Sequence, residues 1–414
     1  MNEFAVIVDA FSTGRLLLKE FIKHGHKCIH VQSSAKVSAY YKKLSPNSKL
    51  FEKIFIFDGN MDFLESELRK YNILSIVPGA EIGVELADIL SEKFGLATNG
   101  TKLSLARRNK YLMSDKLRVN GVNSIKQIRT KIANKAKKFS QKIGNWPIVL
   151  KPIDSAGADG FTLTYSTNEL EKSFLKLMSK EKLVGGIVED ILVQEYLVGT
   201  EFVINAVSWE GKHYISDIWK CKKKMINNTK IYDFEDLISP NADICKLLSD
   251  YIRQVLDILD IKYGPSHSEV IVTKNGPVLI ETGARLCGGL LPSVGDQCLG
   301  YSQLGITIEC YTGDFNFDKI NNRKSLKKHS RCITLISPVK GTLTKTPEYS
   351  FFEKLESFHS IDMNLKAGSK INLTIDLASA PGLIFLVHED IAIIEKEYEA
   401  IRLFEKEFFT ALIS

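Results

Sequence analysis

The stretch that decides the fold is residues 264–289, with the sequence GPSHSEVIVTKNGPVLIETGARLCGG. Two runs rich in apolar and β-branched residues, 268–273 and 278–282, flank an Asn-Gly pair. This pattern is typical of a β-hairpin with a tight turn. Glu269 lies early in the first strand and Glu281 late in the second. We therefore expect the two side chains to lie roughly opposite each other, with Cβ atoms about 5 Å apart.

Two carboxylates that close repel each other unless a cation lies between them. Mg²⁺ is usually held by one or two carboxylates together with substrate phosphates. Arg285 follows Glu281 in a glycine-rich turn, where a guanidinium suits a phosphoryl group. The residues alone also allow a plainer interpretation, with two exposed strand acids and a surface ion pair at Arg285.

Further upstream, two segments have the composition of a nucleotide site. Lys151 ends the strand 148–151, and the small residues at 155–160 can turn backbone N–H groups toward phosphate oxygens. The second segment, 194–201, combines an apolar strand end with Glu201, which suits a base and a ribose. The first segment lacks the Gly-Lys-Ser/Thr of a Walker A motif, and each segment alone also fits an ordinary strand and turn.

The N-terminal part alternates strands with helices. Phe4–Val8, Cys28–Val31 and Ile73–Val77 have the length of strands, and Arg15–His24 carries apolar residues at helical spacing. This α/β order predicts a parallel sheet with helices on both faces, in a Rossmann-like domain over residues 1–97. A G-x-G-x-x-G sequence is missing there, so dinucleotide binding is not expected.

From about residue 146 the pattern changes to strands with glycine-rich turns, which predicts an α+β remainder. We expect a central domain over 98–315, with a subdomain at about 146–196. A linker at 316–330 would lead to a β-rich C-terminal subdomain with a terminal helix over 331–414.

The composition is that of an ordinary globular protein, with 414 residues, 44% of them apolar and 25% charged, and a net charge of +6. No apolar run approaches the roughly 18 residues that a membrane-spanning helix needs, and the start does not resemble a signal peptide. Seven scattered cysteines without a Cys-x-x-Cys argue against zinc and disulfides and favour a reducing cytoplasm.

The segment 102–142 is strongly basic, with 13 Lys and Arg residues against one acid, Asp115. We expect it to be helical, and solvated helix faces are its first interpretation. An electropositive wall beside a polyanionic ligand is the second. A nucleic-acid surface is the third and is disfavoured, because few aromatic residues interleave with these cations.

The order of these elements resembles the ATP-grasp superfamily over about residues 1–310. The matching positions are, in chain order, Lys110 on a helix, Lys151 with the loop 155–160, the segment 194–201, Glu269, Glu281 and Arg285. Within the superfamily, GAEIGVELA at 79–87 and GPSHSE at 264–269 are similar to the branch of bacterial L-amino-acid (dipeptide) ligases. The resemblance implies an ATP-grasp fold in which the subdomain at about 146–196 is a mobile lid that binds nucleotide.

The resemblance also implies which residues bind ATP. For the phosphates it implies Lys110, Lys151 and a closing loop that includes Ser155, Gly157 and Gly160. For adenine it implies the segment Glu195, Tyr196 and Leu197, through the carbonyl of the first and the N–H of the last. For the ribose hydroxyls it implies Glu201.

For the metal, the resemblance implies Glu269 and Glu281, which would bind Mg²⁺, commonly two ions, with Mn²⁺ as an alternative. Arg285 would stabilise the transferring phosphoryl group and the tetrahedral intermediate. His267 would share a strand face with Glu269, where it either donates to an acyl-phosphate oxygen or is a structural histidine. Many members carry Glu-x-Asn, and here the third position is Gly283. The second metal would then depend on Glu281 alone or bind more weakly.

The function implied is an ATP-dependent carboxylate–amine ligase. It would join small molecules, amino acids in this branch, through an acyl phosphate and release ADP and phosphate. The other hypotheses are another ATP-grasp ligase, biotin-carboxylase-like or of the purine pathway, and a non-catalytic nucleotide- or nucleic-acid-binding protein. The partners expected are small-molecule carboxylates and amines, with no nucleic acid and no membrane. A homodimer is compatible with this hypothesis.

Overall fold

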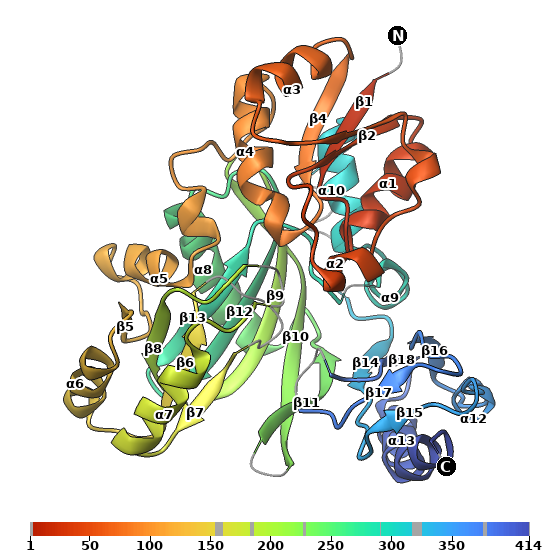
Figure 1. The fold of residues 1–414 in the computed structure, drawn as a ribbon. Helices are drawn as coiled ribbons and strands as arrows, with labels where there is room; N and C mark the ends of the chain where they lie inside the picture. Colours follow the sequence, from red (N-terminus) through yellow and green to blue (C-terminus); the bar gives the residue numbers. More distant parts are fainter. Residues whose placement is uncertain are drawn as a thin grey trace.

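A computed structural model of the chain describes residues 3–153, 160–182, 186–226, 229–289, 291–316, 325–375 and 379–413. Its N-terminal domain, drawn at the top of Figure 1, stands over a long central sheet. A smaller lid sheet lies at the lower left and the C-terminal part at the lower right. Within the described ranges, no helix is long and apolar enough to cross a membrane.

The N-terminal domain is a parallel sheet in the order β3-β2-β1-β4. Its strands are β1 (Phe4–Val8), β2 (Lys27–Gln32), β3 (Lys53–Ile56) and β4 (Ile73–Pro78). Its helices are α1 (Gly14–Lys23), α2 (Ala39–Lys43), η1 (Ser48–Leu50), α3 (Met61–Leu68), η2 (Glu81–Gly83) and α4 (Val84–Lys93). Side chains of α1 fill one face of the sheet, and those of α3 and α4 fill the other. The predicted parallel sheet with helices on both faces is confirmed.

The central sheet is antiparallel, with eight strands in the order β13-β12-β9-β10-β11-β14-β18-β16. Its strands are β9 (Thr200–Trp209), β10 (Lys212–Ile226), β11 (Thr229–Leu237), β12 (Gly264–Thr273), β13 (Gly276–Gly283), β14 (His329–Thr334), β16 (Phe358–Asp362) and β18 (Leu383–His388). The pair β12–β13 is the hairpin predicted from the sequence.

The two faces of the central sheet have different covers. Four helices contribute, namely α5 (Lys110–Val119), α8 (Asp243–Ile258), α9 (Pro292–Cys298) and α10 (Gln303–Thr312). Ile204 and Val270 belong to the face that α5 and α8 bury. Val203 and Trp219 belong to the opposite face, which α9 and α10 cover in part. The α10 helix also contacts α1, so it joins the N-terminal domain to the central sheet.

The segment predicted as a lid, about 146–196, lies in a separate antiparallel sheet in the order β5-β8-β6-β7, which also includes the earlier strand β5. We call this sheet and its helices the lid. Its strands are β5 (Gln127–Thr130), β6 (Ile148–Pro152), β7 (Thr162–Thr164) and β8 (Ile191–Glu195), and its helices are α6 (Ala133–Ile143) and α7 (Thr167–Leu177). Leu150, Leu170 and Phe174 are fully or almost fully buried between sheet and helices. The lid therefore has a hydrophobic core of its own.

The basic segment 102–142 differs from its prediction in two ways. It is not helical throughout, because β5 lies inside it between α5 and α6, after a short η3 (Leu105–Arg107). Nor are all its cations solvated, since Arg107 is fully buried and donates to Asp88 at 2.8 Å. Arg129 pairs with Asp190 at 2.6 Å, another acid outside the segment. Much of the local charge is thus balanced by acids from elsewhere in the chain.

The C-terminal part is continuous with the central sheet, because β14 pairs with β11. Beyond the strands already given it contains β15 (Gly341–Thr342), α12 (Ser350–Glu353), β17 (Lys370–Ile371) and α13 (Ile391–Ala411). The α13 helix confirms the predicted terminal helix, and its side chains pack on those of β14 and β18. Hydrogen bonds join β11 to β14 across the predicted linker at 316–330. The separation of the chain there into a central domain and a C-terminal subdomain therefore stays a prediction.

Candidate active site

The two acids of the β12–β13 hairpin face each other because of a β-bulge. Next to the turn, Thr273 pairs with Gly276, and the same register would place Glu269 opposite Ile280. A register shift directly after Glu269 brings Glu281 opposite it instead. Because successive side chains of a strand point to opposite faces, this one-residue shift puts both carboxylates on one face of the sheet.

Two lysines reach these carboxylates from different elements. Lys110 is the first residue of α5, which begins there because Asn109 caps the helix by accepting from the N–H groups of Tyr111 and Leu112. The Lys110 ammonium contacts the Glu281 carboxylate. Burial disfavours the charged ammonium, but Glu281 outweighs burial and raises the pKa of Lys110. The Lys110 N–H also donates to the Ile153 carbonyl at 3.1 Å, which ties α5 to the lid.

Lys151 comes from the lid strand β6 and is buried. Burial and the nearby charge of Lys110 lower the pKa of Lys151 to about 8, although Glu281 and Glu269 act in the opposite direction. The lid lysine and the α5 lysine therefore lie close enough to influence each other. A polyanion that bound both would relieve their repulsion.

His267 and Glu269 lie two residues apart on the same face of β12. The Nε2 atom of His267 is 3.8 Å from the Glu269 carboxylate, and Nδ1 is 3.0 Å from Oδ1 of Asn205 on β9. Burial opposes protonation of His267, but Cys287 and Glu269 outweigh it and raise the pKa to about 10. Burial likewise opposes ionisation of Glu269, but His267 and then Lys223 and Lys110 lower the pKa to about 2. The two side chains thus favour each other's charged forms.

Arg285 is held by an acid of the N-terminal domain. Its Nε donates to Oε2 of Glu81 at 2.8 Å, and Nη1 donates to the Leu286 carbonyl at 2.8 Å. Burial opposes the charge on Arg285, but Glu81 together with Tyr41, Cys287 and Glu281 outweighs it and raises the pKa. A Cβ atom at Gly283 would lie 2.7 Å from Oε2 of Glu81. The missing side chain at position 283 therefore makes room for the carboxylate that pairs with Arg285.

The predicted ribose acid, Glu201, lies at the start of β9 and is already paired. Its Oε2 accepts from Lys223 on β10 at 2.7 Å, and its Oε1 accepts from the Tyr232 hydroxyl at 3.2 Å. The Lys223 ammonium also lies 4.2 Å from the centre of the Tyr232 ring. Burial disfavours the charge on Lys223, but Glu201 outweighs it and raises the pKa.

The predicted adenine segment links the lid to the central sheet. Glu195 ends β8, and Tyr196 and Leu197 lead into β9. The Glu195 carboxylate accepts from the Lys126 N–H at 2.8 Å, inside the lid. Its role toward adenine stays a prediction.

Two of the predicted phosphate-loop residues, Ser155 and Gly157, lie outside the described residues. Gly160 lies at the described end of that loop and has a positive φ of 73°. A Cβ atom there would come within 2.9 Å of both Pro152 and Leu177. Glycine at 160 therefore has a structural reason, whatever it does for phosphate.

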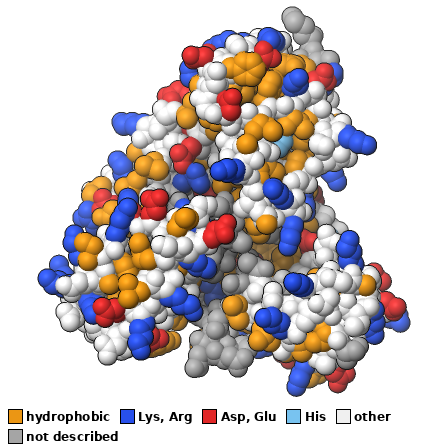
Figure 2. Space-filling view, in the orientation of Figure 1, with side chains coloured by type: hydrophobic (Ala, Val, Ile, Leu, Met, Phe, Trp, Pro, Cys, Tyr) orange, Lys and Arg blue, Asp and Glu red, His pale blue; other side chains and the backbone are white. Residues whose placement is uncertain are grey.

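The fold brings the predicted lysines, acids, histidine and arginine to one region between the lid, the central sheet and the N-terminal domain. Figure 2 shows that the surface is hollowed between the lid and the C-terminal part. Sequence reasoning assigned no role to Glu81, Asn205 or Lys223. Glu81 follows β4 at the carboxyl edge of a Rossmann-like sheet, a position where ligands bind in such domains, and that rule would have singled it out. Asn205 and Lys223 carry no local signal, because only strand pairing brings them here.

The residues present fit a metal that is shared with phosphates. Among the described residues, no group of three or more His, Cys, Asp and Glu side chains forms a complete metal site. Glu269 and Glu281 instead supply two carboxylates on one face, and a cation already contacts one of them. Mg²⁺ typically takes one or two carboxylates and completes its shell with phosphate oxygens and water.

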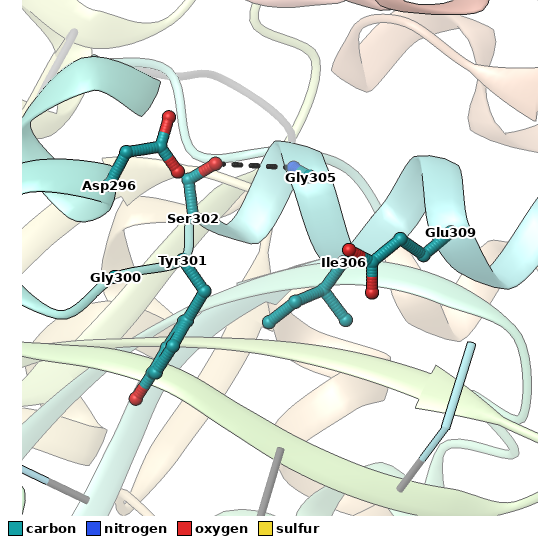
Figure 3. A pocket seen from close by; sticks show the side chains of 7 residues that line it. All are labelled: Asp296, Gly300, Tyr301, Ser302, Gly305, Ile306 and Glu309. Atoms are coloured by element: carbon teal, nitrogen blue, oxygen red, sulfur yellow. Dashed lines mark hydrogen bonds between the residues drawn. The ribbon is translucent and has the colours of Figure 1, made fainter. Parts of the chain in front are cut away.

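A small pocket of about 110 Å³ lies elsewhere, between α9 and α10 (Figure 3). Asp296, Ser302 and Glu309 are among its lining residues, and none of the predicted site residues is. Burial raises the pKa of Asp296. The Ser302 hydroxyl accepts from the Gly305 N–H at 3.2 Å and so caps α10. The Ser302 hydroxyl thus serves the start of a helix, and we assign the pocket no function.

Comparison with known proteins identifies the family. The sequence model described as "ATP-grasp domain" matches residues 144–293. Dapdiamide A synthase from Enterobacter agglomerans is 33% identical over 412 residues, which cover 99% of this chain and 97% of that protein. The chain belongs to the ATP-grasp family of ligases. This ATP-grasp ligase is an enzyme that joins a carboxylate to an amine.

Two further proteins are similar to this ATP-grasp ligase. The L-arginine-specific L-amino acid ligase of Bacillus subtilis is 22% identical over 218 residues, 52% of each chain. The crystal structure of L-amino acid ligase from Bacillus licheniformis superposes with a TM-score of 0.77 at 16% identity, over 97% of both chains. The structural likeness confirms the ATP-grasp fold.

Proposed function

We propose that this ligase forms an amide bond between two amino acids or similar small molecules through an acyl phosphate. One observation carries the proposal: Glu269 and Glu281 face each other across β12 and β13, with Lys110 in contact with one of them. The synthase related over the whole chain favours this chemistry over a carboxylase or a purine-pathway ligase. A non-catalytic nucleotide- or nucleic-acid-binding protein is disfavoured, because the lysines, acids and arginine predicted for the chemistry lie within electrostatic reach of one another.

In the first step, an oxygen of the acid substrate attacks the γ-phosphorus of ATP, and the bond to the β-phosphate oxygen breaks. The products are an acyl phosphate and ADP. Catalysis of such a transfer consists mainly of positioning and of balancing negative charge. Lys110 and Lys151 would neutralise phosphate oxygens, and Glu201 would exchange Lys223 for the ribose hydroxyls. Mg²⁺ bound by Glu269 and Glu281 would supply further positive charge to the phosphates.

In the second step, the amine attacks the acyl carbon, and the C–O bond to phosphate breaks. The tetrahedral oxyanion needs a donor nearby, and Arg285 supplies a charged guanidinium. His267 carries a proton at neutral pH and can donate to an acyl-phosphate oxygen. Since acyl phosphates hydrolyse readily, the lid would exclude water during both steps.

Several finer points belong to the proposal. The number of metal ions is proposed as two. Gly283 offers no side-chain ligand, so the second ion would depend on Glu281. A homodimer and a cytoplasmic location are likewise proposed.

The test is phosphate release from Mg²⁺-ATP against a matrix of paired amino acids, with the nucleotide and amide products identified by mass spectrometry. The expected result is ADP together with a new amide in particular wells. Release of ADP only with bicarbonate or a purine precursor would favour another ATP-grasp reaction. Tight ATP binding without turnover for any pair would contradict an amino-acid ligase and leave a different acid or amine, or a binding protein.

A further inference from the structure

Gln303 is a buried polar residue outside the predicted site that touches three parts of it. It is the first residue of α10 and has no exposed surface. Its Nε2 donates to the carbonyl of Ser266 at 2.8 Å and to that of Ala206 at 3.0 Å. Its Oε1 accepts from the N–H of Cys287 at 3.1 Å. The amide thus bridges β12, β9 and the turn that carries Arg285.

Each contact lies next to a residue of the site. Ser266 precedes His267 on β12, and Ala206 follows Asn205 on β9, opposite Ser266 in the ladder. Cys287 shares a peptide unit with Leu286, whose carbonyl accepts from Nη1 of Arg285. The carbonyl of that peptide therefore binds the guanidinium, and the N–H of the same peptide donates to Gln303.

The chemistry of the three partners requires an amide at position 303. The side chain donates to two backbone carbonyls and accepts from one backbone N–H. Among uncharged side chains, only Gln and Asn carry a two-hydrogen donor and a carbonyl acceptor in one group.

From this geometry we infer that Gln303 is a positioning residue for the ligase reaction. By fixing the Leu286–Cys287 peptide against β9 and β12, it sets where the Arg285 guanidinium lies relative to Glu269 and Glu281. It touches no substrate and acts only through Arg285. The inference rests on the proposed role of Arg285 in the transfer steps.

Thr307 provides a matched control on the same helix. It lies one turn beyond Gln303, is equally buried, and its hydroxyl donates to the Gln303 carbonyl at 2.8 Å. Thr307→Val removes one buried hydrogen bond of α10 without touching the Arg285 turn. It therefore reports what a small loss of stability in this helix does to turnover.

The experiment compares Gln303→Leu, Gln303→Glu and Thr307→Val with the unaltered full-length chain. The first measurement is hydrogen exchange at the Cys287 N–H, which needs no substrate. Gln303→Leu is expected to accelerate that exchange by at least about tenfold, because the buried acceptor is lost. Thr307→Val is expected to leave it unchanged. Equal exchange in all the proteins would overturn the inference even if no substrate pair were known.

The second measurement is the kinetics of amide formation with the pair found in the amino-acid matrix. For Gln303→Leu we expect kcat to fall about 10- to 100-fold, as for a misplaced catalytic group, with the KM for Mg²⁺-ATP nearly unchanged. Thr307→Val should keep the normal kcat well below its melting temperature. If both variants lost kcat equally, the effect would be one of stability, and Gln303 would not position Arg285.

Gln303→Glu keeps the size and shape of the side chain and makes kcat depend on the protonation of position 303. An ionised carboxylate can still accept from Cys287, but it repels the carbonyls of Ser266 and Ala206. Protonation restores one donor, so kcat relative to the unaltered enzyme should rise as the pH falls. A ratio that is flat with pH would contradict the donor role assigned to Nε2.

Discussion

Buried ion pairs occupy both ends of the central sheet, and they differ in how many partners each cation has. At the C-terminal end, Arg331 donates to Asp236 at 2.6 and 2.9 Å and to Glu395 at 2.9 and 2.8 Å. At the β12–β13 end, the Arg285 side chain reaches one carboxylate, that of Glu81, and one backbone carbonyl.

The surroundings of the two arginines differ as well. The Arg331 guanidinium lies 3.8 Å from the ring centre of Phe234 and 5.1 Å from that of Tyr398. Neighbouring Arg402 donates to Glu405 and to two backbone carbonyls, so we call Arg331 and Arg402 with their acids the C-terminal arginine cluster. Its cations have several partners each, which suits a joint between β11, β14 and α13.

The site cluster, defined as Lys110–Glu281, Arg285–Glu81 and Lys223–Glu201, has one cation for each acid. These pairs join separate elements, and the nearby pKa values of Lys151 and Glu269 are shifted to about 8 and about 2. A cation paired with one carboxylate can exchange it for a ligand group, whereas a cation with four hydrogen bonds to two carboxylates cannot do so without loss. The number of carboxylates around each cation thus distinguishes the ion pairs that we propose to bind ligand from those that join elements of the fold.

The largest effect is expected in the site cluster. Glu281→Gln removes a carboxylate at nearly constant volume and should lower turnover by at least about 1,000-fold, because metal and Lys110 lose their shared anion. ADP release and thermal unfolding would be measured together, and the fold should persist. Glu171→Gln, which removes an acid from a lid-surface pair with Lys137, is the matched control. Normal turnover in Glu281→Gln would show that the metal assignment is wrong.

The C-terminal arginine cluster should respond in stability and not in chemistry. Arg331→Met leaves Asp236 without its cation and should lower the free energy of unfolding by about 2–3 kcal/mol. This estimate is small for the loss of a buried cation, because the Glu395 side chain is 55% exposed and water can solvate it. Urea unfolding measures the loss, and kcat per folded molecule should stay normal. A large drop in kcat with unchanged stability would reverse the distinction between the two clusters.

The pH dependence of ATP binding should sharpen the comparison next. Lys151 has a pKa of about 8 in the free enzyme, below its usual 10.5, so it loses its charge as the pH rises through 8. Between pH 7 and pH 9 its charged fraction falls about tenfold, and the Kd for Mg²⁺-ATP should rise by a similar factor. Folding stability should improve over the range where ATP binding weakens. Between pH 8 and pH 10.5 the unfolded chain keeps the Lys151 proton that the folded chain has lost, so the free energy of unfolding rises with pH.

Lys151→Arg is the matched control for that titration, because arginine keeps its charge throughout the range. Calorimetric titration with Mg²⁺-ATP should give a flatter profile for this variant, whatever its absolute affinity. The same steep profile in both proteins would assign the titration to another group.

The smallest effect is expected from an exposed pair that belongs to neither cluster. Arg118 pairs with Asp115 at 2.6 Å on α5, and its side chain is 64% exposed. Arg118→Ala should change the free energy of unfolding by less than about 0.5 kcal/mol and leave turnover unaltered. A larger loss in urea unfolding would mean that partner number and burial do not rank the ion pairs of this protein.

Several elements could be predicted because their signals are local. Phe4–Val8 is a strand with the bounds expected from its apolar run, and the Asn-Gly turn gives the β12–β13 hairpin. The helical expectation for 102–142 failed at β5, because pairing of Gln127–Thr130 with β8 overrides the local preference. A basic composition carries no information about such a partner strand.

The sequence by itself determined the hairpin, its two acids and the lysines and arginine that accompany them, since turn chemistry and alternation act between neighbours in the chain. Only the tertiary structure decided that Glu281 shares a face with Glu269, because a one-residue bulge turns a strand's side chains over. It also decided that Glu81 holds Arg285 across 204 residues of chain and that Gln303 holds the adjoining peptide. Such contacts depend on how separate elements pack, and no local pattern in the sequence encodes them.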